Sequence, residues 1–205
     1  MERRTFLNIG AAGLGSLVVA APLRAQFIPA PSEGKGKWAV IFATKYGTAR
    51  DAAVWVSEGM GGIADVFDVR KPPADLAAYD HLVFGSAIQA FDVLPGIKQY
   101  VEANASKVKG KVRGLFAVCG NLAKMPGPEQ VKTYIDDKLA ALTGATSVPG
   151  NVFGGRITKV VWEPKEWESN MAMYKQMGVS TDDFDNLKRI DCLKLGAEIL
   201  AGVKA

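Results

Sequence analysis

The chain has 205 residues, enough for one domain or for one domain and a tail. Apolar residues make up 48% and charged residues 22%, which excludes a wholly disordered protein. The net charge of +4 is too small for the dense basic surface of a nucleic-acid-binding protein. Two cysteines and one histidine exclude a disulfide scaffold, an all-cysteine zinc cluster and a multi-histidine metal site.

The first 25 residues have the pattern of an export signal. The paired arginines Arg3 and Arg4 precede an almost uncharged run at 9–21, and the small residue Ala25 precedes a candidate cleavage point. The run is too short and too glycine-rich for a spanning helix, which needs ~20 apolar residues. Residues 3–7 resemble the twin-arginine signal, which implies export of an already folded protein to the periplasm. Without cleavage, the leader would anchor the protein to the membrane.

Residues 26–37 are rich in proline and glycine and are interpreted as a linker, which leaves 38–205 as one domain. Apolar runs predict strands at 38–43, 63–69, 80–88, 112–119 and 148–157. Apolar residues at helical spacing predict helices at 48–60, 95–108, 128–142 and 182–203. Alternating strands and helices predict an α/β fold with a parallel sheet covered by helices on both faces.

Ligands of open α/β sheets bind beyond the carboxyl ends of the strands, so the segments that follow Ala43, Gly85 and Cys119 are candidate site loops. The first loop leads directly into a helix, whose free N–H groups and positive dipole end can hold a phosphate. The alternative interpretation is a polar turn that caps the helix. The other two loops have small residues against which a flat ring could lie, although each taken alone is also typical of an ordinary turn. The candidate residues are Thr44, Lys45, Tyr46, Gly47, Thr48 and Ala49; Ser86, Ala87, Ile88 and Gln89; and Cys119, Gly120, Asn121 and Leu122.

The three loops together resemble those of the flavodoxin-like FMN-binding family. Thr-Lys-Tyr-Gly-Thr, Gly-Ser-Ala-Ile and Gly-Asn-Leu follow the first, third and fourth predicted strands. The closer resemblance is to the branch that contains menaquinone-dependent protoporphyrinogen oxidase. It implies a three-layer sandwich with strand order 2-1-3-4-5 and a noncovalent FMN. The phosphate would lie on residues 44–49 and the isoalloxazine between 86–91 and 119–123. Two departures from the family are Ala49, where many relatives have a hydroxyl, and a basic instead of an acidic chain.

The segment 158–178 is too long for a plain connection, since most loops have about 4–6 residues. From Trp162 to Met177 it is rich in tryptophan and methionine, and Trp167, Met171 and Tyr174 share one helical face. Such a stripe either packs back as additional core or contacts a flat ligand, a lipid surface or a protein. The resembling oxidases have an insertion at a similar place, which implies contact with a quinone, a membrane or a redox protein.

Two further features are interpreted as structural. His81 opens an apolar strand, and the acidic residues Asp182, Asp183 and Asp185 would supply favourable charge at a helix N-terminus. Pairing of Cys119 with Cys192 is left open. The leader and the family resemblance together imply an exported FMN protein that transfers electrons. The alternatives are a flavoenzyme that acts on a porphyrinogen or quinone, and a cofactor-less fold that binds a protein. The oligomeric state is not predicted.

Overall fold

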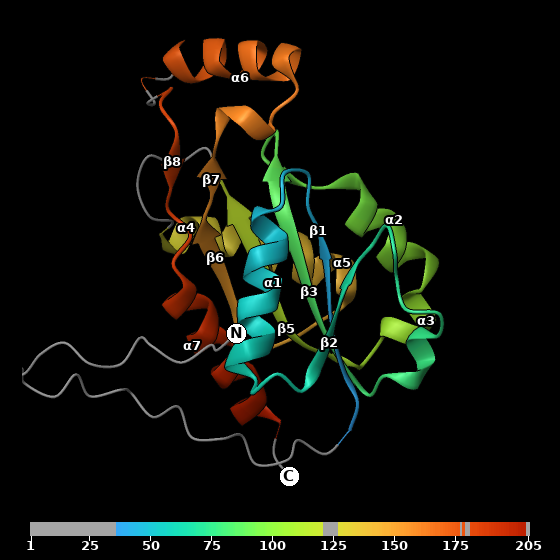
Figure 1. The fold of residues 1–205 in the computed structure, drawn as a ribbon. Helices are drawn as coiled ribbons and strands as arrows, with labels where there is room; N and C mark the ends of the chain where they lie inside the picture. Colours follow the sequence, from blue (N-terminus) through green and yellow to red (C-terminus); the bar gives the residue numbers. More distant parts are fainter. Residues whose placement is uncertain (1–35, 121–126, 177, 179–180, 204–205) are drawn as a thin grey trace, which may run out of the picture. The chain divides into compact units, whose positions relative to one another are not determined.

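The computed structural model describes residues 36–120, 127–176, 178 and 181–203. Its central sheet contains five parallel strands in the order β2-β1-β3-β5-β6 (Figure 1). Because these are the five long strands in chain order, the predicted order 2-1-3-4-5 is confirmed. The strands are β1 (Trp38–Ala43), β2 (Ala64–Asp68), β3 (His81–Gln89), β5 (Val112–Cys119) and β6 (Gly150–Gly154).

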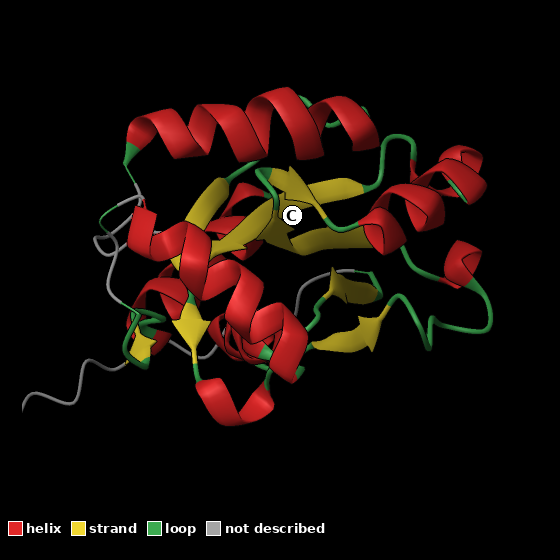
Figure 2. Ribbon diagram, turned by 90° about the horizontal axis from the view of Figure 1, so that it is seen from above, coloured by secondary structure: helices red, strands yellow, loops and turns green. Residues whose placement is uncertain are grey.

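Helices cover both faces of the sheet, as Figure 2 shows from above. One face carries α1 (Thr48–Gly59) and α7 (Arg189–Gly202). The other carries α2 (Pro95–Ala103), α3 (Ala105–Val108) and a helical run that contains a π-helical stretch. That run consists of α4 (Pro128–Val131), η2 (Lys132–Ala140) and α5 (Ala141–Thr143). The α/β sandwich predicted from the alternating pattern is thereby confirmed.

Successive residues of the strands supply the two cores in turn, as a pleated strand requires. On β1, Ala39 and Ile41 face the core under α2, whereas Val40 and Phe42 face the core under α1 and α7. Because β1 is buried along its whole length, its sequence is a continuous apolar run and does not alternate.

Helices α1 and α7 approach each other through two glycines. A Cβ on Gly196 would lie 2.1 Å from the carbonyl oxygen of Val56, and a Cβ on Gly59 would lie 2.2 Å from that of Leu193. Both atoms that would clash belong to the backbone, so the absence of side chains at these two positions sets the distance between the helices.

The remaining elements are short, apart from α6. Strand β4 (Asp92–Val93) pairs antiparallel with the end of β3, and η1 (Leu76–Ala78) precedes β3. The segment after β6 contains β7 (Arg156–Ile157), η3 (Lys159–Val161), α6 (Pro164–Gln176) and β8 (Phe184–Asp185). Strands β7 and β8 pair antiparallel in a sheet of their own. Among the described residues, no helix has the length and apolar character needed to cross a bilayer.

Several predicted boundaries differ from the structure, and those of β2 and β3 shift by only one residue. The strand predicted at 148–157 divides, because the chain leaves the main sheet after Gly154 and enters the β7–β8 pair. The helix predicted at 95–108 is interrupted at Asn104, whose side chain donates to the carbonyl oxygen of Tyr100. The helix predicted at 48–60 ends at Gly59. The helix predicted at 182–203 begins only at Arg189.

The late start of α7 also contradicts the role predicted for the acidic cluster. Asp183 instead accepts the backbone N–H of Lys159, and Asp185 accepts from Arg156 and from the N–H of Leu187. These carboxylates therefore hold together residues 156–185, the segment inserted between β6 and α7. They do not lie in the first turn of the last helix.

The two cysteines lie in different cores. Cys119 belongs to the core under α2 and Cys192 to the core under α7, so the sheet separates the thiols and they do not form a disulfide. Burial raises the pKa of the Cys192 thiol to about 12, which makes it a poor nucleophile. The His81 ring packs against Trp38 with centroids 4.4 Å apart, in line with the structural role predicted for it.

Asp92 provides a pH-dependent link between helices. Lys98 and Lys138 donate to its carboxylate at 2.5 and 3.1 Å, and these bonds, with the N–H of Val93, lower its pKa to about 2. Since the pKa is below its ordinary value of 3.8, the stabilisation is complete above about pH 4 and is lost as the pH falls towards 2.

We expect Asp92→Asn to lower the free energy of unfolding at pH 7 by about 1 kcal/mol, a small value because the pair is partly exposed to water. The difference from the wild type should disappear near pH 2, as measured by urea unfolding at several pH values. Asp137→Asn is the control, because its bond to Lys132 is exposed and should contribute almost nothing. A pH-independent effect of Asp92→Asn would contradict the assignment.

Candidate functional site

A cavity of about 290 Å³ lies at the carboxyl edge of the sheet, where the fold was expected to bind its ligand. Its size is near the lower end of the range for small-molecule sites, ~300–1,000 Å³. Three walls come from the main domain: the β1–α1 loop, the β3–β4 hairpin and the end of β5. The fourth wall comes from the inserted segment, whose helix α6 lies across this end of the sheet (Figure 1).

The β1–α1 loop is shaped to receive an anion. Gly47 has a φ of 92°, a left-handed conformation that favours glycine, and immediately precedes the first turn of α1. Its N–H donates to Thr44 Oγ1 at 3.0 Å, which leaves the Thr44 hydroxyl proton available to a ligand. Thr48 follows as the first residue of the helix and also lines the cavity. The loop thus combines two hydroxyls with the N–H groups of a helix N-terminus.

The β3–β4 hairpin forms the second wall through a strained turn. Ala90 and Phe91 both have positive φ, 48° and 61°, a combination that hairpin turns usually assign to glycine or asparagine. Both residues line the cavity, and Phe91 remains 57% exposed. Ser86 closes the base of the hairpin, since its hydroxyl donates to Ala87 O and accepts from Leu94 N.

The floor of the cavity depends on a close approach between two glycines. A Cβ on Gly155 would lie 2.4 Å from the Cα of Gly120, and the Gly155 N–H donates to Cys119 O at 2.8 Å. Both glycines line the cavity. The chain after β6 therefore passes directly beside the end of β5 before it enters the insertion.

The inserted segment is attached to the β1–α1 loop at three points. Lys45 Nζ donates to Glu166 Oε1 at 2.5 Å, and the Tyr46 hydroxyl donates to the other oxygen of Glu166. The Tyr46 and Trp162 rings stack with centroids 4.3 Å apart and planes 19° apart. Burial, followed by the bond to Glu166, raises the pKa of Tyr46 above its usual range, so its hydroxyl remains a donor at neutral pH.

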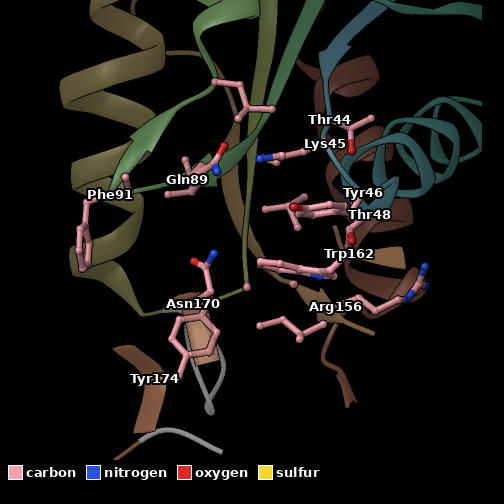
Figure 3. Close-up of a pocket in the computed structure, with 18 of the residues that line it drawn as sticks. Thr44, Lys45, Tyr46, Thr48, Gln89, Phe91, Arg156, Trp162, Asn170 and Tyr174 are labelled. Atoms are coloured by element: carbon pink, nitrogen blue, oxygen red, sulfur yellow. The ribbon is translucent and has the colours of Figure 1, made fainter. Parts of the chain in front are cut away.

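Figure 3 shows Trp162 beneath Tyr46 in the cavity, with Arg156 below and Asn170 and Tyr174 on the opposite side. Arg156 is held by two carboxylates, since it donates to Asp51 and to Asp185, each at 2.8 Å. Its charge is therefore already balanced. In the described ranges, no three acidic, histidine or cysteine side chains are grouped in a way that could hold a metal ion.

The structure brings most of the predicted site residues to this cavity. Eight line it: Thr44, Lys45, Tyr46, Thr48, Ala87, Ile88, Gln89 and Gly120. Gly47 shapes the loop, whereas Ser86 and Cys119 are buried beside the cavity and Ala49 is buried under α7. Asn121 and Leu122 lie outside the described residues.

The sequence left open whether the segment from Trp162 to Met177 packs as additional core or contacts a flat ligand, a lipid surface or a protein. Trp162, Asn170, Met173 and Tyr174 line the cavity, together with Arg156 and Ile157 of β7. The stripe of Trp167, Met171 and Tyr174 packs as a small third core with Ile157 and Phe184, so the alternative of additional core is also correct. The available signal was the tryptophan and methionine content, which does not distinguish core from ligand wall.

Comparison with known families identifies the fold. The model of a family described as "Flavodoxin domain" matches residues 39–182. The chain belongs to the flavodoxin domain family. This flavodoxin domain has no match among curated proteins.

The solved structures that share the fold of this flavodoxin domain include a flavodoxin and a flavodiiron core. Oxidised flavodoxin 1 from Bacillus cereus has a TM-score of 0.50 and 16% identity, over 82% of this chain and 99% of that one. The flavodiiron core of Flv1 from Synechocystis sp. has a TM-score of 0.51 and 13% identity, over 80% of this chain but only 34% of that one. At such low identities the similarity establishes the shared architecture.

Proposed function

We propose that this flavodoxin domain binds FMN noncovalently in the cavity at the carboxyl edge of the sheet and transfers electrons. The observation that carries the proposal is the β1–α1 loop, where a helix N-terminus and the hydroxyls of Thr44 and Thr48 open into a largely apolar cavity. FMN joins a doubly charged phosphate to a flat ring, which is the combination that such a cavity suits.

The residues present fit FMN in kind. Backbone N–H groups and hydroxyls at residues 44–48 suit the phosphate, and the apolar side chains of Ile88, Leu94 and Ile157 suit the ring. Bound flavin would supply the redox chemistry. The protein would hold the phosphate and shield the ring from water, and no side chain is required as an acid or base.

The visible spectrum of the purified full-length chain tests this proposal. We expect flavin absorbance, or uptake of added FMN in a 1:1 complex that survives gel filtration. The control is a Gly47→Val variant, since a β-branched residue is strained at a φ of 92° and should disrupt the loop. A wild type with no flavin absorbance and no FMN uptake would overturn the proposal and favour a cofactor-less protein-binding fold.

A second candidate is a flavin-dependent oxidoreductase that acts on a quinone or porphyrinogen, as in the oxidase branch that the sequence resembles. The favouring observation is a rim of exposed apolar residues near the cavity: Phe91, Val160, Val161 and Met173. Stopped-flow reoxidation by a soluble quinone would separate it from a carrier. Val160→Ser with Val161→Ser should slow that reaction if the rim is the acceptor site, and equal rates would count against it.

We also propose that residues 1–25 direct twin-arginine export to the periplasm. The paired Arg3 and Arg4 support the proposal, and export of a folded protein suits a cofactor that is inserted before transport. Exchanging both arginines for lysine should retain the protein in the cytoplasm, as measured by cell fractionation. Continued export of that variant would reject the twin-arginine route.

A further inference from the structure

One buried hydrogen-bond donor of a cavity-lining residue has no acceptor among the described residues. The indole Nε1 of Trp162 is shielded from solvent, and no described residue accepts its hydrogen. A buried donor without an acceptor costs about 1–3 kcal/mol, so such groups usually have a structural or ligand partner. Trp162 lines the cavity proposed for FMN, which makes a ligand atom the natural acceptor.

The position of the ring relates this donor to the phosphate end of the cavity. Trp162 stacks directly on Tyr46, a residue of the β1–α1 loop. In Figure 3 the nitrogen-bearing ring of the indole lies on the side of Thr48 and Arg156, whereas the six-membered ring extends into the cavity. The donor therefore belongs to the half of the cavity that the loop forms.

Few side-chain donors around the β1–α1 loop lack an existing partner. Position 49 is an alanine buried under α7, so it offers no hydroxyl. The Lys45 ammonium is paired with Glu166 at 2.5 Å, and Arg156 is paired with two carboxylates. An additional neutral donor from another part of the chain would complete the anion site without bringing a further charge into it.

We propose that Trp162 donates its indole N–H to the phosphate of the bound flavin nucleotide. The segment 156–185 thereby completes the anion site that the β1–α1 loop begins. The bonds from Lys45 and Tyr46 to Glu166 hold Trp162 in place, because they fix α6 against the same loop. This inference rests on the proposed binding of FMN.

The test compares FMN with riboflavin, which has the same ring and ribityl chain but no phosphate. Dissociation constants are measured by the quenching of flavin fluorescence on the full chain. Trp162→Phe keeps an aromatic ring beside Tyr46 and removes the donor. Since a hydrogen bond to a charged group contributes about 1.5–3 kcal/mol, FMN binding should weaken roughly 10- to 100-fold. Riboflavin binding should change far less.

Two further variants separate the effect of the indole N–H group on affinity from the effect of the ring. Trp167→Phe is the matched control: Trp167 packs edge-on against Trp162 with ring centroids 6.0 Å apart but does not line the cavity, so both affinities should stay unchanged. Replacing Trp162 by 3-benzothienylalanine keeps the two-ring shape and puts sulfur in place of N–H. This variant should reproduce the FMN-selective loss, and it decides the question if Trp162→Phe fails to fold.

The outcomes separate this inference from the proposed function. If Trp162→Phe weakens the binding of FMN and riboflavin equally, the indole acts only as a ring contact. That result would overturn this inference but not the proposed function. Unchanged FMN affinity in the benzothienyl protein would do the same. A wild type that binds neither ligand would overturn both the inference and the proposed function.

Discussion

Replacing Gly196 by alanine should lower the free energy of unfolding by about 3 kcal/mol, at the upper end of the range for overpacking. The added Cβ would lie 2.1 Å from Val56 O and 2.9 Å from two backbone atoms of Gly59. No side chain can rotate away to relieve this contact, so α1 and α7 must move apart. Because α1 also carries the β1–α1 loop, the site should be disturbed together with the core.

Urea unfolding followed by circular dichroism measures the effect, with Gly202→Ala as the matched control. Gly202 ends the same helix, and a Cβ there would meet only Pro149 Cγ at 4.0 Å. Because Gly202→Ala removes a flexible glycine, the free energy of unfolding of this variant should be unchanged or slightly higher. Equal stabilities for the two variants would show that the α1–α7 distance is not set by Gly196.

Replacing Thr48 by valine should weaken FMN binding roughly 10- to 100-fold, the range for a hydrogen bond to a charged group. Thr48 is the first residue of α1, is 8% exposed and lines the cavity. Valine keeps its shape and removes its hydroxyl. On the proposed binding of FMN, the lost hydroxyl is a phosphate donor, so riboflavin binding should be almost unaffected.

Thr48→Ser is the matched control, since it keeps the hydroxyl and removes only a methyl group. Its affinity for FMN should stay near that of the wild type, measured by fluorescence quenching as for Trp162. If serine and valine weaken binding equally, the methyl group and not the hydroxyl matters at this position. That result would contradict the role assigned to Thr48.

The parts of the molecule that could be predicted are those whose pattern reflects burial. The apolar run of β1 and the helical spacing of α1 exist because both elements pack into continuous cores, so their bounds differ from the predictions by at most one residue. The β1–α1 loop could be predicted because a strand end, a glycine and a helix start are adjacent in sequence. Eight of the predicted site residues then reach one cavity through the topology of the sheet.

The parts that could not be predicted depend on contacts between distant residues. The late start of α7 follows from the pairing of Ile157 with Phe184 in β7–β8, which no local pattern reveals. The hairpin at Ala90 and Phe91 uses residues that rarely adopt positive φ, so its turn had no sequence signal. The composition of the stretch from Trp162 to Met177 allowed contact with a flat ligand, but only the stack on Tyr46 shows that Trp162 lies beside the β1–α1 loop.

The segment 156–185 leaves and re-enters the domain at nearly the same place. Asn186 N donates to Gly155 O at 3.0 Å, and Arg156 pairs with Asp185 in the β7–β8 sheet just beyond that bond. Without this segment, β6 could continue to Leu187 and α7 through a short turn, with the cores on both faces of the main sheet intact. The segment is therefore a module that could be exchanged to change one wall of the cavity while the supporting scaffold is retained.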